Sequence, residues 1–97
     1  MECELKGYLS YLILWIINNE SRNGAGISRE IEKRRGTKPN PGTIYPLLKE
    51  LKNKELVSVD EYKYYSLTLR GEKELKEECQ FFCNIFYDAE KMFKFCK

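Results

Sequence analysis

The side chains with the clearest chemical potential lie between residues 38 and 63, and their chemistry suits nucleic-acid binding. Lysine ammonium groups neutralise backbone phosphates, while hydroxyl and amide groups hydrogen-bond to phosphates or to base edges. Both kinds of group surround a short stretch with the apolar spacing of a helix, which can present them on one surface. The candidate DNA-binding residues chosen in this way are Lys38, Asn40, Thr43, Tyr45, Lys49 and Lys63.

The distribution of charge agrees with a phosphate-facing surface in the middle of the chain. The 97 residues carry a net charge of only +2. Residues 22–54 contain nine basic and three acidic side chains, so this segment carries +6 and the remainder −4. A basic segment between acidic ends fits a protein that meets DNA with one surface. Charge alone leaves an ordinary solvated surface open as the alternative.

The other reactive side chains do not form a catalytic or zinc-binding pattern. The chain has no histidine, no serine elbow and no phosphate loop. The spacing of its four cysteines (Cys3, Cys79, Cys83 and Cys96) does not match a zinc site. Cys79 and Cys83 lie one helical turn apart and could hold a soft metal or oxidise with a partner helix; the alternative is that they are small hydrophobic side chains kept reduced in the cytosol. The sequence therefore predicts no enzymatic activity, catalytic residue, metal or cofactor.

The elements that must position the candidate residues follow from the periodicity of the apolar side chains. Helical spacing predicts helices over residues 5–19, 27–35 and 41–53, and alternation predicts a hairpin with strands over 56–60 and 63–67. Two short helices joined by a tight turn form a helix-turn-helix, and a hairpin packed on the helices forms its wing.

The third of these helices has the features of a helix that enters the DNA major groove. Asn40 is a suitable N-cap, and proline at residue 41 is tolerated because the first N–H groups of a helix have no partner inside it. One side would face a core, and the other would present Tyr45 and Lys49. The inward positions are Ile44, Leu48 and Leu51.

Residues 68–96 predict one long helix, with Thr68 as its N-cap. Its apolar positions alternate in steps of four and three residues, the spacing of a coiled-coil seam. A helix of about 29 residues is about 43 Å long, more than so small a domain can cover, so the seam predicts a homodimer. The alternative is a helix that folds back on its own domain. The predicted dimerisation residues are Leu75, Cys79, Phe82, Phe86, Ala89 and Phe93.

The predicted fold is therefore mainly α with a small β-hairpin. A winged helix-turn-helix DNA-binding domain covers residues 1–67, and a C-terminal dimerisation helix covers residues 68–97, together forming one compact unit. The first residues do not resemble a secretory signal, and no apolar run reaches the length of about 20 residues that crosses a bilayer. These features predict a soluble cytoplasmic protein with no membrane partner.

Two stretches of the chain resemble the PadR family of winged-helix transcriptional regulators. They are residues 42–51 (GTIYPLLKEL) and residues 63–71 (KYYSLTLRG), and Leu75 beyond the second stretch also fits. The opening helix, with LIL at residues 12–14, is similar to that of the family. The resemblance covers the chain to about residue 75, and the last helix is similar in kind.

The resemblance implies a dimer that binds a palindromic DNA operator and usually represses transcription. Thr43 and Tyr45 match DNA-facing positions of the family, and Lys63 and Tyr64 match its wing. The chain departs from the family in two places. Residues 24–27 read GAGI, without the aromatic residue common there. The wing is short and has acidic residues at its tip, so Lys63 is expected to provide most of the wing's contribution.

Two further interpretations stay open. The winged helix and the aromatic helix could together form a protein-interaction module that does not bind specific DNA, since fold alone does not decide function. Aromatic side chains could line a cavity for a small aromatic effector between the domain and the last helix, or they could simply form the core. The aromatic residues in question are Trp15, Phe81, Phe82, Phe86 and the tyrosines.

Overall fold

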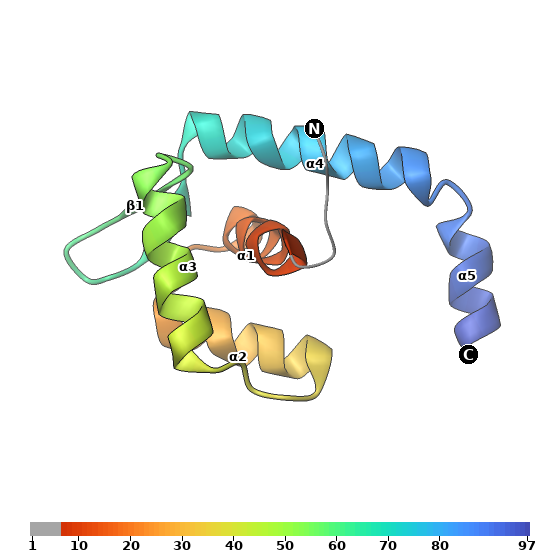
Figure 1. Cartoon of the computed structure of the whole chain (residues 1–97), viewed down its shortest axis with the longest axis horizontal. Coiled ribbons are helices and arrows are strands. Elements are labelled where there is room, and N and C mark those ends of the chain that lie inside the picture. Colours follow the sequence, from red (N-terminus) through yellow and green to blue (C-terminus); the bar gives the residue numbers. More distant parts are fainter. Residues whose placement is uncertain (1–6) are drawn as a thin grey trace.

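The computed structural model describes residues 7–97, so the predicted start of the first helix at residues 5 and 6 lies outside the described part. Across residues 7–97 the elements are α1 (Tyr8–Asn19), α2 (Gly24–Arg35), α3 (Pro41–Asn53), β1 (Val57–Val59), β2 (Tyr65–Leu67), α4 (Leu69–Ile85) and α5 (Ala89–Cys96). Figure 1 shows α1 in the middle, α2 and α3 around it, α4 across the top and α5 turning down at the far end. The predicted fold class, mainly helical with a small hairpin, is confirmed.

The second helix begins three residues earlier than the apolar pattern predicts. Asn23 has extended backbone angles, and its Oδ1 accepts the N–H of Gly26 at 2.8 Å, so it caps a helix that starts at Gly24. The helix ends at Gly36, whose φ of +86° lies in the left-handed region. The apolar pattern missed the first turn because that turn contains two glycines and an alanine, which carry no amphipathic signal.

A single core holds the three helices of the domain together. α1 packs on α2, α4 and β2, and α3 packs on α2 and β1. Fully burying an aliphatic side chain contributes about 1.5–3 kcal/mol each, so this core fixes α3 firmly against α2. The largest fully buried side chains are Ile13, Leu14, Ile16, Ile27, Ile31, Ile44 and Leu48.

The wing is a short antiparallel hairpin tied to the segment before α2. Val57 pairs with Leu67, and Val59 pairs with Tyr65, so the strands are shorter than predicted. The N–H of Tyr65 also donates to the carbonyl of Arg22 at 2.8 Å, in an isolated antiparallel bridge. This bridge pairs a third segment with the hairpin, which is only marginally stable as two isolated strands.

The wing passes into α4 without a flexible linker. The Thr68 hydroxyl donates to the carbonyl of Glu55 at 2.6 Å and accepts the N–H of Gly71 at 2.9 Å, so one side chain ties the wing base and caps α4. Its N–H donates to the carbonyl of Leu56. A Cβ on Gly71 would lie 1.9 Å from the carbonyl oxygen of Leu56, so only glycine allows this approach. The predicted role of Thr68 as N-cap is confirmed.

The predicted single helix over residues 68–96 is wrong in one respect, because the chain turns at Phe86–Asp88 and divides it into α4 and α5. Phe86 leaves helical geometry with φ −108° and ψ 47°. The carbonyl of Asp88 accepts the N–H groups of Lys91 and Met92, in the first turn of α5. Asn, Phe, Tyr and Asp occur together here, and all are weak helix formers. α5 has no buried residues, so within one chain little packing energy favours a continuous helix over the break.

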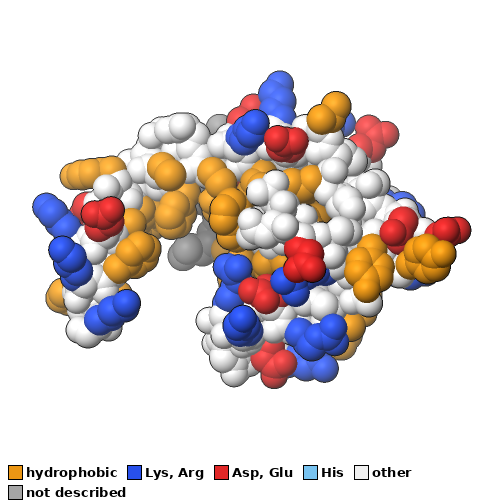
Figure 2. All heavy atoms as spheres, turned by 180° about the vertical axis from the view of Figure 1, so that it is seen from behind, with side chains coloured by type: hydrophobic (Ala, Val, Ile, Leu, Met, Phe, Trp, Pro, Cys, Tyr) orange, Lys and Arg blue, Asp and Glu red, His pale blue; other side chains and the backbone are white. Residues whose placement is uncertain are grey.

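Hydrophobic side chains remain exposed on the C-terminal arm, by which we mean residues 79–97. Figure 2 shows them along the arm and on the adjoining surface of the domain. Phe93 is 63% exposed and Phe95 is 89% exposed. Of the predicted dimerisation residues, Leu75 is only 3% exposed and belongs to the core of its own chain, Cys79 and Ala89 are half-buried, and the three phenylalanines are exposed. No described helix combines the length and the apolar character that crossing a bilayer requires.

Candidate nucleic-acid interface

α3 has a buried side and an outward side, as the sequence predicts. At about 100° per residue, Thr43 and Tyr45 lie at the two edges of the outward side, with Gly42, Pro46 and Lys49 between them. All five are exposed. Glycine and proline keep the middle of this side low, so the helix can approach another surface closely. The side chains on the buried side are Ile44, Leu48 and Leu51.

Asn40 serves as the N-cap of α3. Its Oδ1 accepts the N–H of Gly42 at 2.7 Å, which confirms the predicted cap. Pro41 occupies the first helical position, where a missing N–H costs nothing. The exposed amide NH₂ of Asn40 is therefore the group left to donate outward, and Lys38 lies in the exposed turn just before it.

The ring of Tyr45 rests on the first turn of α2. A Cβ on Gly24 would lie 2.6 Å from Cε1 of Tyr45 and 2.9 Å from its hydroxyl oxygen, so the missing side chain of Gly24 makes room for the ring. Tyr45 is still 50% exposed. Gly24 thus orients a candidate DNA-binding side chain. The sequence feature that could have indicated this role is a glycine directly after the N-cap residue Asn23.

A hollow of about 450 Å³ lies where α2, α3 and the wing meet. Its lining brings together Tyr45 and Lys63, two of the predicted residues, from separate elements. The backbone of Gly24 and Ala25 forms another part of the wall. First-turn N–H groups have no acceptor inside their helix, and the helix start carries partial positive charge. The hollow is therefore suited to an anion. Sequence analysis missed its contributors Asn23, Gly24, Ala25 and Tyr65.

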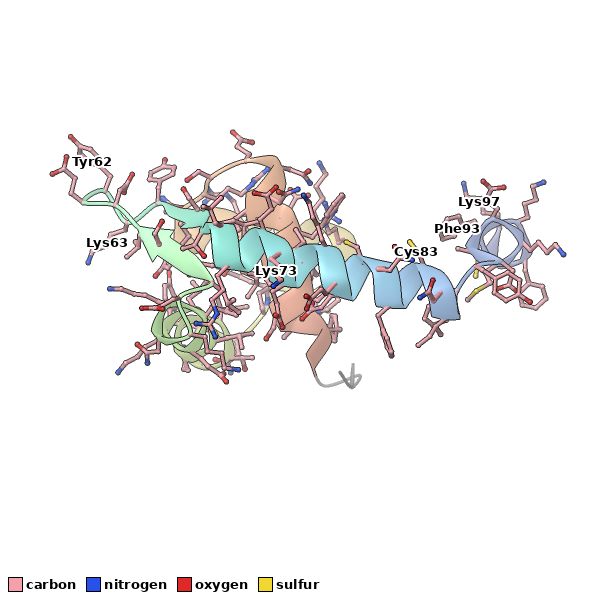
Figure 3. All side chains as sticks on the ribbon, turned by 90° about the horizontal axis from the view of Figure 1, so that it is seen from above. Tyr62, Lys63, Lys73, Cys83, Phe93 and Lys97 are labelled. Carbon is pink, nitrogen blue, oxygen red and sulfur yellow. The ribbon has the colours of Figure 1, made fainter. Side chains whose placement is uncertain are left out.

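The tip of the wing is built around Asp60. Its Oδ1 accepts the N–H groups of Tyr62 and Tyr64, each at 2.9 Å, so this carboxylate is held by its own loop. The expectation that acidic side chains at the tip repel phosphate stays a prediction. Lys63, between Tyr62 and Tyr64, has φ +67°. Figure 3 shows Lys63 and Tyr62 leaving the wing on different sides. Tyr64 is exposed, as is Glu61, the acid at the tip without such contacts.

Several arginines of the basic segment are engaged within the chain. Arg22 faces Glu20 and Glu30 at 3.4 and 3.8 Å. Arg34 pairs with Glu30 at 3.1 Å, and Arg35 Nη1 donates to the hydroxyl of Tyr8 at 3.2 Å. The positive charge that faces outward near α3 therefore comes mainly from the lysines.

A second hollow, of about 500 Å³, lies beside α4 on another part of the surface. It is lined by Trp15, Cys79 and Cys83, together with polar side chains of α1 and α4. Phe82 stacks on Phe86 with ring centroids 4.9 Å apart, and neither ring lines this hollow. Among residues 7–97, no group of three or more His, Cys, Asp or Glu side chains could hold a metal ion.

Comparison with known families identifies the fold. Residues 13–77, about two thirds of the chain, match the transcriptional regulator PadR-like family. The matched region includes α2, α3, the wing and the start of α4, so it contains the whole candidate interface. No curated protein gives a significant match to this chain.

Solved structures agree with this assignment. A PadR-like transcriptional regulator from Bacillus cereus is 29% identical, with a TM-score of 0.76 over 92% of this chain and 94% of its own. A PadR-like transcription factor from Bacteroides fragilis is 30% identical, with a TM-score of 0.75 over 90% and 91%. RosR of H. salinarum is 28% identical, with a TM-score of 0.76 over 91% and 86%. The family match and these winged-helix neighbours show that the chain belongs to the PadR-like family of transcriptional regulators, which are DNA-binding proteins.

Proposed function

We propose that the protein is a homodimeric repressor that binds a palindromic operator in double-stranded DNA. The observation that carries the proposal is the outward side of α3, which ends at the anion-suited hollow shared by Tyr45, Lys63 and the start of α2. PadR-like regulators generally have no enzymatic activity, and a transcriptional regulator of this family would act in the cytoplasm.

In this proposal α3 enters the major groove with its N-terminal half. The low surface around Gly42 and Pro46 lets the helix approach base edges, while Thr43 and Tyr45 reach toward the two groove walls. Lys49, one turn beyond Tyr45, reaches a guanine edge or a phosphate; a good base contact discriminates by about 1–3 kcal/mol. Lys38 and Asn40 lie at the entrance of the same groove.

The hollow takes a phosphate beside the groove. Backbone N–H groups at a helix start and a nearby lysine are a common anion-binding combination. The N–H groups of Gly24 and Ala25 provide the first part, and the ammonium of Lys63 provides the second. Tyr64, which is exposed on the wing, contacts the DNA backbone beside this phosphate.

The C-terminal arm joins two copies. Phe82, Phe86 and Phe93 are exposed, although large side chains of this kind normally gain about 1.5–3 kcal/mol each from burial. A second copy of the same arm offers a matching apolar surface, and a two-fold dimer reads a palindrome with half-sites about 34 Å apart. Residues 1–67 then bind DNA, while residues 68–97 hold the dimer through exposed rings above the buried Leu75.

The hollow beside Trp15 is where a small aromatic effector would bind in this proposal. Trp15 is 40% exposed and offers an aromatic surface at the junction of α1 and α4. An effector there would touch the helix that carries the dimerisation surface.

The proposal is tested by DNA binding. The natural promoter nearest the gene serves as the labelled duplex, and affinity is measured by fluorescence anisotropy at about 150 mM salt. Tyr45→Ala and Lys49→Ala are each expected to weaken binding at least about tenfold, since each removes a contact worth about 1–3 kcal/mol from both copies of the dimer. Lys73→Ala removes an exposed lysine of α4 that is not part of the candidate interface, and should leave affinity unchanged. Unchanged affinity in both α3 variants, with dimers intact, would show that another surface binds DNA.

The second candidate function is a protein-interaction module, favoured by the exposed aromatic residues of α5. It predicts no retention on a duplex-DNA or heparin column even at low salt. Retention that declines between about 50 and 200 mM salt is instead the mark of phosphate contacts.

A further inference from the structure

Two thiols of α4 open onto the same hollow. Cys79 is half-buried and Cys83 is exposed, and both line the hollow of about 500 Å³ beside Trp15. Figure 3 shows Cys83 on the stretch of α4 that leads toward α5. The hydroxyl of Tyr11 donates to Sγ of Cys79 at 3.1 Å, which holds that side chain in place. Burial and this hydrogen bond raise the pKa of Tyr11, so its proton stays on the oxygen.

The spacing of the two thiols disfavours a disulfide between them. Helical positions i and i+4 have Cβ atoms about 5–6 Å apart. A disulfide needs Cβ atoms about 3.5–4.5 Å apart, so forming one here would distort α4. Each sulfur extends one bond beyond its Cβ, so the two sulfurs can approach each other more closely than the two Cβ atoms and can bond to one shared centre.

The same surroundings disfavour zinc. A structural zinc site completes four protein ligands, whereas the described residues provide no group of three or more suitable side chains. Thiolates are soft ligands and select soft partners. The pair therefore matches a thiophilic centre that needs only two sulfur ligands.

We propose that Cys79 and Cys83 form a dithiol site for a thiophilic ligand with two exchangeable positions, of the class of the organic trivalent arsenicals. With phenylarsonous acid, each thiol gives its proton to one arsenic-bound hydroxyl, which leaves as water. Two As–S bonds replace two As–O bonds, and arsenic remains trivalent, so no oxidant or reductant takes part. The phenyl group lies in the hollow against Trp15. This site goes beyond DNA binding, and its test needs no DNA.

The test uses the full chain with Cys3→Ser and Cys96→Ser, which leaves only the two proposed ligands. Titration with phenylarsonous acid should give one adduct by intact mass, a loss of both free thiols, and a change in the emission of Trp15, the only tryptophan. Adding Cys79→Ser or Cys83→Ser should weaken binding by about 10²–10⁴-fold, because the second bond is then no longer intramolecular.

Two controls separate a spaced pair from reactive thiols in general. Cys83→Ser with Asn84→Cys keeps the thiol count but moves one thiol by about 100° around the helix, and should bind as weakly as the single-thiol variants. Phenylphosphonic acid has the aromatic group without a thiophilic centre and should bind at least about 100-fold more weakly. Equal affinity in the shifted variant, equal affinity for phenylphosphonic acid, or binding that leaves Trp15 emission unchanged would each overturn the proposal. Circular dichroism verifies that every variant is folded.

Discussion

Lys63 is the residue at which the demands of backbone and ligand conflict. Its φ of +67° lies in the left-handed region, which costs a residue with a side chain about 1–2 kcal/mol relative to glycine. The Asp60 carboxylate holds the loop in this shape through two N–H groups. A lysine at such a position agrees with the proposed use of its ammonium group as a phosphate ligand, because Lys63 lines the hollow beside Tyr45.

Replacing Lys63 separates these two effects. Lys63→Gly should raise the free energy of unfolding by about 1 kcal/mol, because the strain is relieved. It should nevertheless weaken DNA binding and lower the slope of log affinity against log salt by about two, because each copy in the dimer loses one phosphate contact. Lys63→Ala should show the same DNA defect without the gain in stability. Urea unfolding and anisotropy measure the two quantities, and an unchanged salt slope in both variants would exclude Lys63 as a phosphate ligand.

At this scale the sequence predicts well wherever a residue acts locally. The caps at Asn40 and Thr68 depend on neighbours within three positions, and both are confirmed. The partnership of Gly24 with Tyr45 was missed because it joins two helices. Nothing in the spacing of either residue indicates the other. The predicted DNA-binding side chains are all exposed, and their contacts stay predictions.

Among the elements, the junction of wing and α4 depends most on one residue type. Gly71→Ala should lower the free energy of unfolding by at least about 2 kcal/mol, because the new methyl group would overlap the carbonyl oxygen of Leu56 and force the backbone apart. Lys73→Ala, two residues along the same helix and exposed, should change it by less than about 0.5 kcal/mol. Thermal unfolding measures both, and equal stability of the two variants would mean that α4 can slide past the wing at no cost.

α4 also carries an acid in an unfavourable place. Partial burial, and secondarily the charge of Glu74, raise the pKa of Glu78. One of its carboxylate oxygens is buried without a hydrogen-bond partner among the described residues. Since the folded-state pKa lies above the unfolded one, the ionised group destabilises the fold at neutral pH, and this penalty disappears as the pH falls below the unfolded value.

Glu78→Gln should therefore stabilise the protein at pH 7 by a few tenths of a kcal/mol, a small effect because the group is only partly buried and solvent screens its charge. The gain should disappear near pH 4, where the wild-type carboxyl is protonated in both states. Urea unfolding at the two pH values measures it, with Glu77→Gln as the exposed neighbour for comparison. A gain that is equal at both pH values would point to packing instead of charge.

The helices themselves were predictable, whereas the turn at Phe86–Asp88 was not. The steps of four and three residues continue through it, so periodicity alone favours one helix. Only the weak helix propensity of its residues indicates a break, and packing normally overrides propensity. The buried position of Leu75 was also hidden, because a seam residue and a core residue have the same spacing.

For the whole molecule, a dimer on one operator predicts a steep dependence on salt. If two copies neutralise about 6–10 phosphates, affinity should fall by about 10³–10⁵ between 50 and 200 mM salt. Phe82→Ser with Phe86→Ser removes two exposed rings of the arm, so it should give monomers by sedimentation and about half the salt slope. Leu69→Ser removes an apolar side chain that is still more exposed, at 87%, but lies at the other end of α4, and it should leave both unchanged. Monomeric wild-type protein with an undiminished slope would contradict the dimer.

The fold class and family of the whole molecule could be predicted because its motifs lie in continuous stretches of sequence. The shape of the two hollows could not, since each combines residues from helices that are distant along the chain. How the arm lies relative to the domain also depends on the turn at Phe86–Asp88, which periodicity does not reveal because the helical spacing continues through it.

The three hydrogen bonds of Thr68 connect the base of the wing rigidly to the start of α4. A tilt of α4 would consequently move the wing with it. In a dimer, the distance between the two copies of α3 would then depend on the turn at Phe86–Asp88, at the opposite end of α4 from Thr68. Substitutions in this turn would change the preferred spacing of the half-sites and leave the preferred bases the same.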